Sequence, residues 1–251
     1  MTIRRALQRI LGRGSEETAS WAVSSETAEP IPLGSDAETC DALRELLFEA
    51  AGPGAPVEGL IRGDAILKAS VDLRVRHVLS TIEEPVACRK GCGHCCQVPV
   101  STFPFEIFPI VHHVRTTWSG GERRALMRRL RKYREAVTNP KRGERHPWCP
   151  FLKEGSCSIY DVRPTICRTH HSSDLSACLR DPTSRPPSAQ PFYRAMLGLY
   201  DGAFEALGPR GGFPNGYEMA LAVEIALREP NTLDRFLVGG DPFVAAYRRR
   251  S

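Results

Sequence analysis

The stretch Cys88-Arg-Lys-Gly-Cys92-Gly-His-Cys95-Cys96 places four cysteines within nine residues of this 251-residue chain. Eight of the nine cysteines lie in the region that begins here, because the next four follow as Cys149, Cys157, Cys167 and Cys178. So dense a group of thiols has two physical explanations. It is a disulfide framework in an exported protein, or a metal or iron–sulfur site in a protein whose thiols stay reduced.

The N-terminal sequence and the chain length favour the second explanation. Residues 1–13 are basic, but arginine and glutamine interrupt their apolar residues, so we expect no signal peptide. No segment approaches the roughly 20 apolar residues that span a bilayer. The cysteine count is odd, and a chain of this length can bury a core without cross-links. We therefore expect a cytoplasmic location, reduced thiols and metal ligation.

The charge balance is only slightly basic, with 34 Lys and Arg against 29 Asp and Glu. A net charge of +5 is too weak to indicate nucleic-acid binding by itself. Basic residues are concentrated between 115 and 145, mostly on a helix expected over 122–137. Such a helix presents either a solvated face or a docking surface for an acidic protein partner.

The apolar pattern predicts helices on both sides of the first cysteines. Leu67, Val71, Val75, Val78 and Ile82 recur at intervals of four, four, three and four, which is helical spacing. The pattern predicts a long helix with Asp64 as its N-cap that ends before Pro85. Further helices are expected from near Asp36 to Gly52 and over 105–118, 122–137, 191–207, 217–228 and 233–238.

No segment shows convincing strand alternation, so the predicted fold is mainly α. We expect one helical domain over 36–251, with an irregular, metal-organised segment at 149–178 inside it. Residues 1–35 are rich in Ser, Glu, Thr, Ala, Pro and Gly and are expected to form a disordered tail. Cys40 lies on the first helix and is expected to be a small buried hydrophobe.

The cysteine spacings fit more than one kind of metal site. Cys92-x2-Cys95 suits zinc or an iron–sulfur cluster. Cys88-x3-Cys92-x2-Cys95 is also the spacing by which radical S-adenosylmethionine enzymes hold a [4Fe–4S] cluster, although the β/α barrel of those enzymes is not expected here. Adjacent Cys95 and Cys96 point in different directions, so either two sites share this loop or one of the pair is not a ligand. The candidate ligands are Cys88, Cys92, Cys95, Cys96, Cys149, Cys157, Cys167 and Cys178, with His94, His112, His113, His146, His170 and His171 in reserve.

The ordered motifs resemble those of the YkgJ-type cysteine-cluster proteins. The resemblance runs from Cys88-x3-Cys92-x2-Cys95-Cys96 through Cys149-Pro-Phe-Leu to Cys157-Ser-Ile-Tyr-x2-Arg-Pro-x2-Cys167-Arg. It implies a zinc- or iron-chelating domain, and hence a metal-binding protein that coordinates zinc or an iron–sulfur cluster. Relatives in this family include flagellin lysine N-methylases, so the resemblance also suggests an alternative: an S-adenosylmethionine-dependent protein lysine N-methylase that uses an iron–sulfur cluster.

The residues between the cysteines complete the expected site. Pro150 and Pro164 stiffen the turns that carry ligands, because proline fixes φ. Arg163 and Arg168 can balance the negative charge of several thiolates, bind a cofactor, or form salt bridges to Asp161, Asp174 or Glu154. No dinucleotide-binding, Walker or nucleophile-elbow motif is present, so no catalytic residue is assigned. An apolar shell is expected from Phe151, Leu152, Ile159 and Tyr160.

Overall fold

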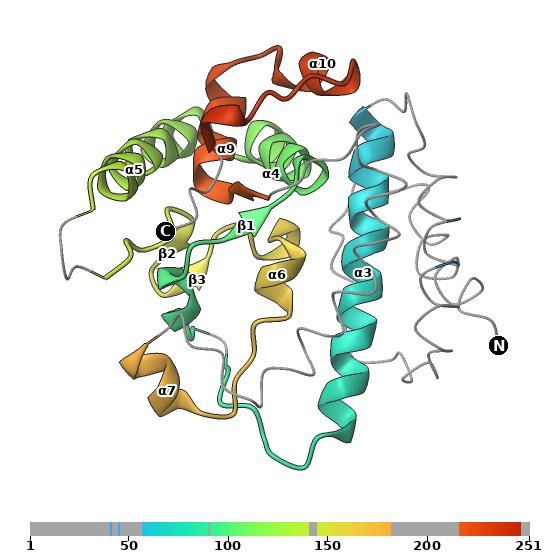
Figure 1. Cartoon of the computed structure of the whole chain (residues 1–251), viewed down its shortest axis with the longest axis vertical. Coiled ribbons are helices and arrows are strands. Elements are labelled where there is room, and N and C mark those ends of the chain that lie inside the picture. Colours follow the sequence, from blue (N-terminus) through green and yellow to red (C-terminus); the bar gives the residue numbers. More distant parts are fainter. Residues whose placement is uncertain are drawn as a thin grey trace.

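The computed structural model describes residues 41, 45, 57–89, 91–140, 145–181 and 216–246, and within them the fold is mainly α, as predicted. The longer helices are α3 (Val57–Thr81), α4 (Pro104–Thr117), α5 (Gly120–Thr138) and α9 (Met219–Arg228), followed by the short α10 (Thr232–Leu237) (Figure 1). Among these residues, no helix has the length and apolar character needed to cross a membrane.

Several predictions fall outside the described residues. They are the N-terminal tail, most of the helix expected from Asp36, the helix expected over 191–207, and Cys40. Asp41 and Glu45 are described, and both are helical and exposed. The division into a tail and one helical domain over 36–251 stays a prediction.

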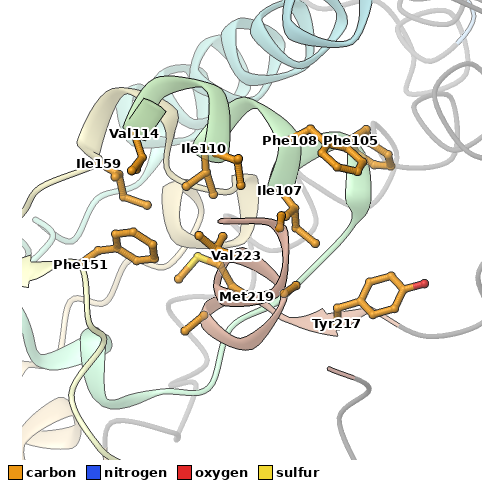
Figure 2. Close-up of a cluster of buried hydrophobic side chains, with 14 of the residues drawn as sticks. Phe105, Ile107, Phe108, Ile110, Val114, Phe151, Ile159, Tyr217, Met219 and Val223 are labelled. Carbon is orange, nitrogen blue, oxygen red and sulfur yellow. The ribbon is translucent and has the colours of Figure 1, made fainter. Parts of the chain in front are cut away.

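The hydrophobic core lies where α4 packs against α3 and α9, and α9 against α5. Helix α4 is buried along most of its length, with Phe105, Ile107 and Ile110 almost fully excluded from solvent. Figure 2 shows Ile107 and Ile110 on the side of α4 toward Met219 and Val223 of α9. Burying each large apolar side chain contributes roughly 1.5–3 kcal/mol, so this contact is a main source of stability.

Helix α3 begins earlier than the sequence pattern predicts. It starts at Val57, so Asp64 lies inside the helix, and its assignment as the N-cap is wrong. Asp64 is buried and accepts a 2.5 Å hydrogen bond from Lys68, which stands one turn later. The predicted inward positions Leu67, Val71 and Val75 are buried, and the helix ends before Pro85 as expected.

Helix α5 agrees closely with its prediction. Ser119 and Glu122 form a capping box, in which each side chain bonds the other residue's backbone N–H. Leu126, Leu130 and Tyr133 face the core as predicted. The helices expected over 105–118, 217–228 and 233–238 are likewise confirmed, with small differences at their ends.

Two small antiparallel sheets were not foreseen. Strand β1 (Ser101–Thr102) pairs with β4 (Tyr217–Glu218), and β2 (Leu152–Lys153) pairs with β3 (Ser156–Cys157). Two residues are too few to show an alternating pattern. The β2–β3 turn has positive φ at Glu154 (51°) and Gly155 (76°), as a type I′ hairpin turn requires.

The segment 149–178 contains more regular structure than predicted, and the helical core anchors it. Besides the hairpin it forms η2 (Tyr160–Val162), α6 (Thr165–Arg168) and α7 (Leu175–Arg180), whose N-terminus lies inside the segment. Glu106 of α4 is fully buried and accepts hydrogen bonds from the Thr165 backbone N–H (2.7 Å) and hydroxyl (2.8 Å). Lys68 of α3 donates to the Val162 carbonyl (2.9 Å). Helices α3 and α4 therefore hold this segment through polar contacts that need no metal.

We expect Glu106→Ala to lower the free energy of unfolding by about 2 to 4 kcal/mol, because it leaves buried donors of Thr165 and Thr102 without their acceptor. Glu106→Gln keeps an acceptor oxygen and should cost less. Urea unfolding with a chelator present measures this without a contribution from metal, and Glu135→Ala on the exposed face of α5 is the control. Equal stability of Glu106→Ala and the control would contradict the anchoring role.

Candidate metal centre

All eight clustered cysteines are described, and each is a half-buried free thiol. Cys95 and Cys96 lie on the 3-10 helix η1 (His94–Gln97), and Cys157 ends β3. Cys167 belongs to α6 and Cys178 to α7. The elements β2, β3, α6 and α7 lie on the side of the molecule away from α10 (Figure 1). The fold thus brings cysteines from both sequence groups to one region.

Backbone hydrogen bonds connect Cys96, Cys149 and Cys157. The Cys149 N–H donates to the Cys96 carbonyl at 2.7 Å, and the Leu152 N–H donates to the Cys149 carbonyl at 3.0 Å. Leu152 stands opposite Cys157 in the β2–β3 ladder. Cys167 lies near the same thiols. Burial raises the pKa of Cys167 well above its ordinary value, and the nearby Cys149, Cys95 and Cys157 raise it further.

A second group of cysteines lies where residues 87–88 contact the residues just before α7. The Ala87 N–H donates to the Ser172 carbonyl at 2.8 Å, and the Cys88 thiol lies 3.9 Å from the same oxygen. Asp174 caps α7, which carries Cys178 and contacts η1. Burial raises the pKa of Cys88. The nearby thiols raise it further: Cys92, Cys95 and Cys178.

Burial controls the protonation of these thiols. It raises the pKa of Cys149 to about 12, and the nearby Cys157 and Glu218 add to the rise. Cys95 is the exception. A hydrogen bond with Cys96 is the main cause that lowers the Cys95 pKa to about 7, and the charge of Arg163 also lowers it. The same hydrogen bond raises the pKa of Cys96. The Cys96 thiol therefore keeps its proton and donates the hydrogen bond to Cys95.

The donor set fits a metal that prefers thiolates. Among the described residues, no three His, Cys, Asp or Glu side chains are close enough to hold a metal ion as they stand. The thiols are gathered but not closed around a centre, so binding requires a local contraction. Several thiolates near one another in a buried region repel, and a zinc ion or an iron–sulfur cluster removes that cost.

The two predicted arginines have different environments. Arg168 is buried, pairs with Asp72 of α3 at 2.6 Å and donates to the carbonyls of Arg163 and Asp161. Its ion pair is therefore with Asp72 and not with the three acids that the sequence suggested. Arg163 lies over the Tyr160 ring at 3.9 Å. Its charge opposes the rise that burial causes in the pKa of Cys157, and of Cys167 in the same way. Arg163 thus lowers the pKa of more of the thiols, and Arg168 acts in the same direction on Cys157.

The expected apolar shell is partly present, and His171 lies close by. Phe151 and Ile159 are buried and Leu152 is half-buried, whereas Tyr160 is 57% exposed.

Burial, followed by the charges of Arg163 and His170, lowers the pKa of His171 to about 4. Its imidazole is therefore neutral near pH 7, which is the form that binds metals. Of the other reserve histidines, His112 is exposed on α4, and His94, His113, His146 and His170 are half-buried.

Sequence reasoning missed the residues that position the site. Lys68 and Asp72 of α3 and Glu106 of α4 hold the backbone that carries Cys157 and Cys167. Only Glu106 left a signal, since it is the one charged residue in the apolar stretch 103–111. Such an acid is expected to meet buried donors.

The basic helix presents much of its charge to solvent. Three of its arginines have internal partners. Arg129 donates to the Pro150 carbonyl (2.7 Å), Arg134 pairs with Glu224 (2.9 Å), and Arg123 donates to the carbonyls just before the helix. Docking of an acidic protein on this face stays a prediction. Its exposed basic residues are Arg123, Arg124, Arg128, Arg131 and Lys132.

Residues 87–184 match the family model CxxCxxCC, described as a putative zinc- or iron-chelating domain. This segment is similar to that family. The resemblance predicted from the motifs is thereby confirmed, and the matched residues include all eight clustered cysteines. No curated protein and no solved structure matches the chain significantly. The CxxCxxCC segment includes α4 and α5, whereas α3 and α9 lie outside it and pack against it.

The affinity of the CxxCxxCC segment for zinc should rise with pH. Burial keeps Cys149 and Cys167 protonated near neutral pH, and a thiol must lose its proton to bind a metal. Protons therefore compete with the metal, and the competition weakens as pH rises. Calorimetric titration in two buffers with different ionisation heats should count about three to four protons released per zinc near pH 7. An affinity that does not change between pH 6.5 and pH 8 would contradict ligation by these thiols.

Proposed function

We propose that this chain binds zinc or an iron–sulfur cluster through the cysteines between Cys88 and Cys178. The observation that carries the proposal is the gathering of eight free thiols, from four short elements and the loops beside them, into one half-buried region. The family match to a zinc- or iron-chelating domain supports metal binding in general. The anchoring of this region by α3 and α4 supports a preorganised site rather than a random cluster.

Either metal centre would have a clear physical role here. A structural zinc would fix loops and short elements that bury little apolar surface of their own. In an iron–sulfur centre, the buried Phe151 and Ile159 would limit solvent access, and the charge of Arg163 would favour the reduced, more negative state. Thiolate donors are compatible with both, so the identity of the metal is a question for direct measurement.

Protein purified without oxygen should contain metal that elemental analysis detects. Brown colour with broad visible absorption is expected for an iron–sulfur cluster, and a colourless protein with stoichiometric zinc for a zinc site. Cys92→Ser should lower the metal content, because it removes one of the thiolate ligands. Cys40→Ser is the matched control and should leave the metal content unchanged. A folded, reduced wild-type protein without metal would refute the proposed function.

Arg163 supports a second candidate, an S-adenosylmethionine-dependent protein lysine N-methylase. The Arg163 Nε is buried and has no hydrogen-bond partner among the described residues. A guanidinium with a free donor beside a thiolate cluster can bind a carboxylate, such as that of S-adenosylmethionine. In this alternative the cluster would need an iron without a protein ligand, so that the cofactor could bind beside Arg163.

If this candidate holds, the metal-loaded protein should bind S-adenosylmethionine in calorimetry. Arg163→Ala should weaken the binding at least tenfold, because a charged hydrogen bond contributes about 1.5–3 kcal/mol. Arg131→Ala, on the exposed face of α5, is the control. Metal content is measured on the same samples, so that loss of the cluster is not mistaken for loss of the cofactor contact. No binding to fully loaded protein would exclude this candidate and leave metal binding intact.

A further inference from the structure

We propose that the eight cysteines form two separate four-thiolate sites that share the loop at 88–96. The inner site consists of Cys96, Cys149, Cys157 and Cys167. The outer site consists of Cys88, Cys92, Cys95 and Cys178. This assignment rests on the proposed metal binding and goes beyond it by stating which thiols share a centre.

The inner site is built on the β2–β3 hairpin and α6. The Cys149 N–H to Cys96 carbonyl bond (2.7 Å) brings η1 to the hairpin, and the pairing of Leu152 with Cys157 brings the two ends of the hairpin together. Arg168 and Glu106 hold α6, which carries Cys167, against α3 and α4. The four thiols of this site thus come from elements that contact one another and the core.

The outer site lies where residues 87–88 and η1 come close to α7. The Ala87 N–H to Ser172 carbonyl bond (2.8 Å) and the Cys88 thiol beside the same oxygen place Cys88 near the start of α7. Helix α7 contacts η1 and presents Cys178 in the turn after its Asp174 cap. Cys92 and Cys95 then complete a Cys-x3-Cys-x2-Cys loop with Cys178 as the fourth ligand.

The two proposed sites meet at η1. The thiols of Cys95 and Cys96 hydrogen-bond to each other there, so the two sites adjoin at this pair. Cys96 is tied to Cys149 through its carbonyl, which assigns it to the inner site. Cys95 borders both groups, because it raises the pKa of Cys88 as well as that of Cys157 and Cys167. We assign it to the outer site, where it completes the set of four thiols. Structural zinc sites and cubane iron–sulfur clusters each take four protein thiolates, so eight ligands correspond to two centres.

Four variants test the partition by metal content per folded chain. Cys167→Ser and Cys178→Ser should each retain about half of the wild-type metal, since each change opens one four-ligand site. The same-site pair Cys88→Ser with Cys178→Ser should also retain about half, because its two changes fall on one site. The cross-site pair Cys167→Ser with Cys178→Ser should retain almost none. Cys40→Ser is the control and should match the wild type.

Alkylation of exposed thiols followed by peptide mass mapping gives a second readout. In Cys178→Ser, the partition predicts that Cys88, Cys92 and Cys95 become reactive while the inner four stay protected. For wild-type protein titrated with a chelator, the outer four should become reactive as one group before the inner four, which lie closer to the buried Phe151 and Ile159. This arm needs no variant, so misfolding of a variant cannot obscure the result.

Two results would overturn the partition while leaving metal binding intact. The first is complete loss of metal in both single variants, as a single shared centre would give. The second is alkylation of inner and outer thiols in parallel during chelation of the wild-type protein. A metal-free wild-type protein would instead refute the proposed function itself, so the two failures are distinguishable.

Discussion

The buried carboxylate of Glu106 joins the helical core to the segment that carries most of the cysteines. It accepts hydrogen bonds from Thr102 of β1 and from Thr165, the first residue of α6. Lys68 and Asp72 make comparable contacts from α3. Phe151 and Ile159 of the cysteine-rich segment are buried in the core, and these polar contacts add to that packing in positioning its short elements. The α-helical packing thus acts as a frame for the thiols.

A cluster of thiols on such a frame is stable only while it is protonated or bound to metal. Burial raises the pKa of Cys149 and Cys167, so the metal-free form avoids accumulating negative charge. Arg163 supplies one positive charge, and it is too little for eight thiolates. The chemistry of the region therefore demands a cation whenever the thiols ionise. This requirement, more than any single spacing, is what connects the fold to metal binding.

The long helices were predictable because their apolar residues repeat at helical intervals, as Leu126, Leu130 and Tyr133 do on α5. The two-residue strands were not, since they form through partners distant in sequence, such as Ser101 with Glu218. The pattern predicts Asp64 as an N-cap because an acid before an apolar run is typical of one, whereas its burial beside Lys68 depends on tertiary contacts. The candidate ligands could be named from their residue type, but their grouping could not. It depends on bonds such as that from Cys149 to Cys96.

The frame holds the thiols near one another without closing them, and this links metal binding to local folding. No three potential ligands among the described residues stand at coordinating positions. Gly91, with φ of 84°, lets the loop turn sharply between Cys88 and Cys92, and a larger residue there would be strained. Part of the free energy of metal binding must therefore contract this loop and α7 onto η1. Because α3 and α4 already anchor α6, we expect the contraction to fall mainly on the Cys88 loop and α7, so the proposed outer site should be the less rigid of the two.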